Sequence, residues 1–125
     1  MKTIKITIAL LGFLSVLLGA FGAHALQDQL SSAALRSFET AVRYQFLHVL
    51  VLLFIQSYTP FSRQQKTRLS ALFLSGIFFF SGSIYAISLA GIPAKFIWFL
   101  TPLGGVFLLA AWLQMAWYFS KRNEQ

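Results

Sequence analysis

Long apolar runs, separated by short polar segments, divide the chain into four blocks. The blocks cover residues 6–26, 41–59, 69–90 and 96–119. Each block is close to the roughly 20 residues that an α-helix needs to cross the hydrocarbon core of a bilayer. The pattern therefore predicts an all-α fold, an integral membrane four-helix bundle that forms one domain over residues 1–125.

The polar stretch before the second block, residues 27–40, predicts a short interfacial helix. Ser31 or Ser32 can cap its first turn, and Leu35 and Phe38 fall on one face at helical spacing. Because this stretch contains neither Gly nor Pro, the second helix can begin in it, outside the hydrocarbon.

Turn residues and basic residues end the blocks. Pro60 stops the second block, and Gly91-Ile92-Pro93 stops the third. The basic segment 62–68 is expected to be a tight connection between antiparallel helices. In the fourth block, Pro102 predicts either a kink or a short re-entrant opening.

The first block shares features with a secretory signal peptide. Lys2 and Lys5 precede an apolar run, and Ala23-His24-Ala25 matches a small-residue cleavage site. Since three further apolar blocks follow, we expect this block to be kept as a spanning helix.

Composition agrees with a membrane protein: 58% of residues are hydrophobic, 10% are charged, and mean hydropathy is +0.72. The net charge of +7 does not indicate a nucleic-acid partner, because the basic residues lie at the ends of the apolar blocks. The chain has no cysteine, which excludes disulfides, thiolate metal sites and a cysteine nucleophile.

The distribution of Lys and Arg predicts the orientation. Seven basic residues lie at the two ends of the chain and in the middle connection, whereas Arg36, Arg43 and Lys95 lie toward the other side of the membrane. Because positively charged connections resist translocation, both termini are expected in the cytoplasm of a cell with an inner or plasma membrane.

This orientation places most polar membrane residues in the outer half of the bundle, and it leaves the inner half almost wholly apolar. Glu39 and Arg43 are four residues apart and are expected to pair at the interface. The remaining members of the predicted cluster are His24, Tyr44, Gln45, His48, Ser81, Ser83, Tyr85 and Thr101.

Three roles are open for this cluster. It can fix helix packing in a non-enzymatic protein and offer a small pocket or partner surface, which is the interpretation we favour. Alternatively, His24 and His48 can serve a small oligomeric transporter or proton-linked carrier, or act as the base of an intramembrane enzyme. We expect no cofactor and no metal, because two histidines and one carboxylate match no zinc-binding spacing.

Glycines are expected where helices approach one another closely in the membrane. The lipid bilayer is the one partner that the sequence requires, while a homo-oligomer or a membrane-protein partner is left open. The predicted packing positions are Gly12, Gly19, Gly22, Gly76, Gly82, Gly104 and Gly105.

Four motifs, in order along the chain, carry a resemblance to a known family. They cover residues 19–24 (GAFGAH), 38–48 (FETAVRYQFLH), 80–85 (FSGSIY) and 101–107 (TPLGGVF). Together they resemble the YgdD-type small inner-membrane proteins, a domain of unknown function (423) that extends to a small eukaryotic transmembrane protein. The resemblance implies a multi-pass membrane protein, and it implies no enzymatic activity, cofactor or catalytic residue.

Overall fold

The computed structural model describes residues 2–122, which form an all-helical molecule. Its elements are α1 (Lys2–His24), α2 (Ser32–Ser57), α3 (Arg63–Leu89), α4 (Ala94–Ile97) and α5 (Leu100–Ser120). Four segments are long and apolar enough to cross a membrane, with α4 and α5 forming the last of them together. The prediction of an all-α membrane fold with four spans is confirmed.

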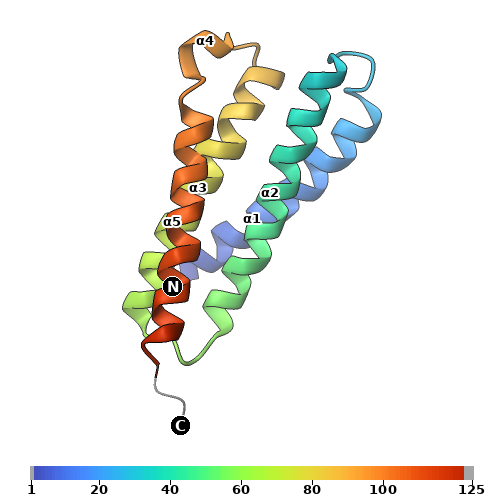
Figure 1. Cartoon of the computed structure of the whole chain (residues 1–125). Helices are drawn as coiled ribbons and strands as arrows, with labels where there is room; N and C mark the ends of the chain where they lie inside the picture. The colour runs from blue at the N-terminus through green and yellow to red at the C-terminus, as the bar shows by residue number, and fades with distance from the viewer. Residues whose placement is uncertain (1, 123–125) are drawn as a thin grey trace.

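The long helices form two pairs that are joined through the middle of the chain. α1 packs on α2, α3 packs on α5, and α2 packs on α3 (Figure 1). Figure 1 places α4 and the α1–α2 connection at the top, called here the α4 end, and the 58–62 connection and the C-terminus at the bottom, called here the C-terminal end. The two pairs diverge toward the α4 end.

α2 begins earlier than the apolar block predicts. The Ser31 side chain caps it by accepting a hydrogen bond from the Ala34 backbone N–H (3.1 Å), and the helix continues without a break to Ser57. The expected interfacial helix is therefore not a separate element but the first turns of α2. Residues 27–31 form a turn.

Two other boundaries also differ from the apolar blocks. Ser62 and Gln65 form a capping box, so most of the basic segment predicted as a connection is the first part of α3. The fourth span is interrupted at Trp98 and Phe99, and α5 begins at Leu100. Pro102 therefore lies in the first turn of α5, where its missing N–H removes no intrahelical hydrogen bond.

Three glycines lie where neighbouring elements leave no room for a side chain. A Cβ at Gly104 would lie 2.2 Å from the backbone nitrogen of Phe80, so α3 and α5 touch backbone to backbone there. A Cβ at Gly76 would lie 2.5 Å from the Leu108 side chain, and one at Gly22 would lie 2.6 Å from the Phe38 ring. Such close approach is the contact that small residues permit between membrane helices.

The other predicted packing glycines differ among themselves. At Gly12 and Gly19, a Cβ would meet α2 side chains at an ordinary 3.5 Å. Gly82 and Gly105 would have no neighbour within 4 Å, so neither is a helix-packing position. Gly105 directly follows Gly104 in the sequence, but its Cβ direction is turned about 100° further around the helix.

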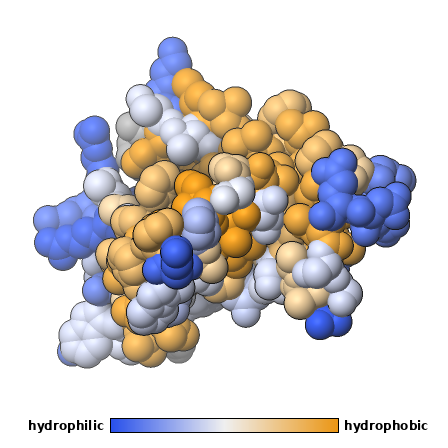
Figure 2. Space-filling model, turned by 90° about the horizontal axis from the view of Figure 1, so that it is seen from above, coloured by the Kyte–Doolittle hydropathy of each residue, from blue (hydrophilic) through white to orange (hydrophobic). Residues whose placement is uncertain are grey.

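Buried apolar side chains gather between the four long helices toward the C-terminal end. Fully buried members include Ile8, Leu52, Ile55, Leu69 and Phe73. Large apolar side chains on the other faces are exposed, among them Leu113 (73% exposed), and Figure 2 shows hydrophobic surface over much of the molecule. In a bilayer these faces contact lipid, so their exposure has no hydrophobic cost.

Candidate functional site

The side chain of Gln45 joins three helices near the middle of the bundle. It is 2% exposed, its Nε2 donates to the backbone carbonyl of Leu11 in α1 (2.9 Å), and its Oε1 accepts from the hydroxyl of Tyr85 in α3 (2.7 Å). Both ends of the amide are therefore occupied by helices other than its own. Such bonds hold membrane helices together where the hydrophobic effect does not.

Three hydroxyl groups join helices closer to the α4 end. Ser81 in α3 donates to the Ala41 backbone carbonyl in α2 (2.7 Å), and the two oxygens of Ser83 and Thr101 lie 2.5 Å apart between α3 and α5. Because these hydroxyls already have protein partners, they act as contacts between helices.

His48 links α2 to α5 and is bonded at both ring nitrogens. Its Nδ1 lies 2.7 Å from the backbone carbonyl of Tyr44, and its Nε2 accepts from the indole N–H of Trp112 (3.1 Å). A carbonyl only accepts and an indole N–H only donates, so this pattern selects the neutral ring protonated at Nδ1. The ring is 4% exposed and also lies 5.6 Å, centroid to centroid, from Phe73.

These residues do not form the single cluster that the sequence predicts, because their hydrogen bonds join different helices at different levels. Since α2 begins at Ser32, His48 lies about 24 Å along the helix from that end and about 14 Å from Ser57, at 1.5 Å per residue. His48 is thus past the middle of helix α2, whose first residues, 32–40, belong to the polar segment before the second apolar block. Trp112, which bonds to His48, lies at the same level.

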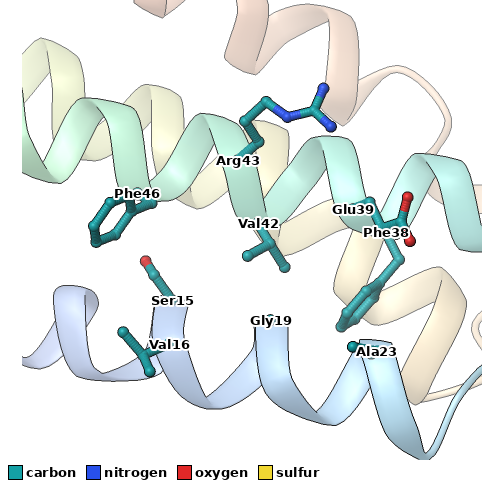
Figure 3. A pocket seen from close by; sticks show the side chains of 10 residues that line it. Ser15, Val16, Gly19, Ala23, Phe38, Glu39, Val42, Arg43 and Phe46 are labelled. Carbon is teal, nitrogen blue, oxygen red and sulfur yellow. The ribbon is translucent and has the colours of Figure 1, made fainter.

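The remaining predicted members stay apart from the buried set. His24 is the last residue of α1 and is exposed, so the two histidines do not share a site. Glu39, Arg43 and Tyr44 lie on the exposed side of α2, and the Tyr44 ring stacks on Phe80 with centroids 4.8 Å apart. In Figure 3 the Arg43 side chain rises from α2 away from α1, and the Glu39 carboxylate lies beside Phe38.

A second buried polar cluster, which the sequence analysis missed, lies at the C-terminal end. Gln56 Nε2 donates to the hydroxyl of Ser70 (2.9 Å), and Lys66 donates to the Gln56 backbone carbonyl (2.9 Å). Gln56 follows His48 by eight residues and continues the buried stripe of α2, which includes Gln45 and Leu52. The helical spacing of these polar residues was a signal that could have found it.

Replacing the buried pair Gln56 and Ser70 together is expected to leave stability almost unchanged. Gln56 Oε1 is buried without a hydrogen-bond partner among the described residues, so Gln56→Leu removes an unsatisfied acceptor as well as a bond. With Ser70→Ala, no group is orphaned, and the free energy of unfolding should change by no more than about 0.5 kcal/mol. Unfolding in SDS–detergent mixed micelles measures it, and Gln56→Leu alone should be less stable than the double variant.

A groove of about 520 Å³ lies between α2 and α5 on the bilayer-facing side, and it is called here the α2/α5 groove. His48 and Trp112 meet across its deeper part, and the indole is 41% exposed. The groove exists because α2 and α5 diverge, each packing on α3. It is lined by Arg43, Tyr44, Leu47 and His48 of α2, Phe80 of α3, and Gly105, Leu108, Leu109 and Trp112 of α5.

A second groove, of about 330 Å³, lies between α1 and α2 and is called the α1/α2 groove (Figure 3). The small residues of α1 leave this space, since Gly19 and Ala23 present almost no side chain to it. Phe38, Val42 and Phe46 line the α2 side, and Glu39 and Arg43 stand at its rim. Arg43 thus belongs to both grooves.

No metal centre is formed by the part of the chain that the structure describes. Within residues 2–122, no group of three or more His, Asp or Glu side chains could hold a metal ion. The two grooves therefore present apolar walls, a few aromatic rings, the cation of Arg43 and, in the α1/α2 groove, the carboxylate of Glu39.

Comparison with known proteins agrees with the fold and the motifs. A family model described as "Protein of unknown function (DUF423)" matches residues 18–105, which contain α2, α3 and α4 in whole, the end of α1 and the start of α5. The chain belongs to the DUF423 family. No solved structure matches it.

Relatives from several bacteria cover most of the DUF423 chain. A UPF0382 membrane protein of Staphylococcus saprophyticus is 38% identical over 92% of this chain and 94% of its own length. A UPF0382 membrane protein of Haemophilus influenzae is 36% identical over 88% of this chain and 87% of its own length. The UPF0382 inner membrane protein YgdD of Escherichia coli is 35% identical over 86% of this chain and 81% of its own length. The expected family is confirmed, and the chain is a multi-pass membrane protein.

Proposed function

We propose that this DUF423 protein is a non-enzymatic membrane protein that holds a lipid acyl chain in the α2/α5 groove. The observation that carries the proposal is the groove itself, which is open to the bilayer, walled by Leu47, Leu108 and Leu109, and closed at depth by the His48–Trp112 pair. Apolar walls with a few placed polar groups are typical of ligand sites, and an acyl chain is the apolar ligand that a bilayer supplies.

The bonding of the polar residues supports a non-enzymatic role. A general base needs a ring nitrogen able to take a proton from a substrate, but Nδ1 of His48 faces a carbonyl and Nε2 already accepts from Trp112. A carrier that passes protons between His24 and His48 is not supported either, because His24 is exposed at the end of α1. Packing and binding are what these arrangements favour.

We also propose that both termini and the 58–62 connection face the cytoplasm. The support is the charge distribution, since Arg63, Lys66 and Arg68 follow that connection at the start of α3, and Lys121 and Arg122 follow α5. A reporter fused after residue 122 should be active only in its cytoplasmic form. Activity of a periplasmic reporter at that position would reverse the orientation.

Fluorescence quenching of Trp112 by brominated acyl chains tests the groove. The chain has three tryptophans, so replacing Trp98 and Trp117 by Phe leaves Trp112 as the single probe. In bilayers with dilute brominated lipid, we expect Trp112 to be quenched more than the bulk lipid composition predicts. Gly105→Leu, which fills the groove where a Cβ has open space, should lower the quenching to the bulk level.

The matched control for the quenching experiment is Gly82→Leu. Gly82 is also helical and also has open space beside it, but it lies outside the groove. It should leave the quenching unchanged. Equal quenching in the parent, Gly105→Leu and Gly82→Leu proteins would mean that no lipid is held in the groove.

A further inference from the structure

Arg43 stands on the ridge of α2 that separates the two grooves. It is at the rim of the α1/α2 groove on one side and of the α2/α5 groove on the other. Among residues 2–122, no other residue lines both of these grooves. The Arg43 guanidinium thus lies next to both apolar grooves.

The position of Arg43 along the bundle fits the level of lipid headgroups. Arg43 and Gly105 line the same groove, and Gly105 lies only about 8 Å along α5 from its first residue, Leu100. A long arginine side chain at that depth reaches the polar interface while its methylene stem stays in the apolar region. The Arg43 side chain is exposed, and in Figure 3 its guanidinium extends away from α1.

Chemistry at this position favours an anionic group. A cation among exposed apolar side chains such as Phe46 and Leu47 is costly unless an anion accompanies it. The nearest carboxylate along α2, that of Glu39, lies beside Phe38 in Figure 3. A guanidinium binds a phosphate through two parallel hydrogen bonds, which makes phosphate a better match than a carbonyl or an ammonium group.

Both grooves meet at Arg43 and follow α2, one on each side of it. The α1/α2 groove extends along α2 from Phe38 to Phe46, so that Arg43 stands beside its middle. The α2/α5 groove continues from Gly105 to Trp112, about 10 Å deeper along α5. A ligand with one anionic head and two apolar tails matches this arrangement.

We propose that an anionic phospholipid with two acyl chains straddles α2, with its phosphate on Arg43 and one chain in each groove. The proposal rests on the proposed function, because the chain in the α2/α5 groove is the one assigned above. It adds the second chain, the headgroup charge and the residue that recognises it. The bound lipid belongs to the leaflet at the α4 end.

Native mass spectrometry of the detergent-purified full chain tests the headgroup. We expect one molecule of added phosphatidylglycerol to bind to each protein molecule. Its affinity should be about tenfold higher than that of phosphatidylcholine with the same acyl chains. Arg43→Gln should abolish that preference. Arg36→Gln is the matched control, since Arg36 is an exposed arginine two turns earlier on α2 that lines neither groove, and it should keep the preference.

The same measurement tests the second chain. Lysophosphatidylglycerol, with one chain, is expected to bind about tenfold more weakly than phosphatidylglycerol. Val16→Phe changes an exposed position of the α1/α2 groove. It should weaken the binding of the two-chain lipid and leave the binding of the one-chain lipid unchanged. An Arg43→Gln protein that still prefers phosphatidylglycerol, or equal binding of the one- and two-chain lipids, would overturn the proposal.

The two proposals can fail separately. If Trp112 quenching depends on Gly105 while Arg43→Gln changes nothing, an acyl chain occupies the α2/α5 groove but no phosphate binds Arg43. If Gly105→Leu leaves the quenching unchanged, the proposed function fails. Binding that is lost in Arg43→Gln but not in Gly105→Leu would instead indicate an anion held at the surface without a chain in the groove.

Discussion

Gly104→Ala is expected to separate α3 from α5 and to destabilise the protein more than any other single methyl group added at a glycine. The new Cβ would lie 2.2 Å from the Phe80 nitrogen and 2.7 Å from its Cα. Both atoms belong to the backbone, so no side-chain rotation relieves the overlap and the helices must move apart. Overpacking in a close-packed interior costs about 1–3 kcal/mol, and we place this backbone overlap at about 3 kcal/mol.

Gly105→Ala is the control for that change. It adds the same methyl group one residue later, where no atom lies within 4 Å, and it should keep or slightly raise stability because Ala favours helix. Unfolding of both variants in SDS–detergent mixed micelles, with the parent protein alongside, gives the difference. Equal stability of the two variants would mean that α3 and α5 do not touch at Gly104.

Gln45→Leu is expected to have the second-largest effect, because one amide holds two other helices. The substitution removes the donor to the Leu11 carbonyl and leaves the Tyr85 hydroxyl without the acceptor it has now. An interhelical hydrogen bond in a membrane contributes about 0.6 kcal/mol on average, and an orphaned buried hydroxyl adds a further cost, so we expect a loss of about 2 kcal/mol.

A double-mutant cycle with Tyr85→Phe separates the two terms of this loss. Removing the Tyr85 hydroxyl in the Gln45→Leu background should restore part of the stability, because the hydroxyl is then no longer orphaned. Mixed-micelle unfolding of the single and double variants gives the coupling energy. Strictly additive losses would show that the Tyr85–Gln45 bond contributes nothing.

Much of the fold could be predicted from the sequence, because the bilayer sets a simple requirement on length and polarity. Four apolar blocks gave four spans, and the ordered motifs gave the family. Boundaries were harder to predict, since helices begin at caps rather than where the apolar run starts. Ser31 and Ser62 extend α2 and α3 well beyond the hydrophobic blocks.

The candidate site was predicted only in part, because the partners of its polar side chains come from other helices. Gln45 bonds to α1 and α3, and His48 bonds to α5. The spacing of Gln45, His48 and Gln56 indicates which face of α2 is buried. It does not indicate which groups these side chains bond to. The Leu11 carbonyl and the Trp112 indole carry no local sequence signal, because only the packing of α1 and α5 brings them there.

Photocrosslinking with a lipid that carries a diazirine on an acyl chain tests whether the α2/α5 groove holds a lipid. At a low ratio of lipid to protein, we expect labelled peptides to concentrate at groove positions such as Leu47 and Leu109. Leu113 and Phe78 are at least as exposed as these two but lie outside the α2/α5 groove, and they should be labelled little. Labelling spread evenly over all four positions would show a protein that is merely surrounded by lipid, and no lipid held in the groove.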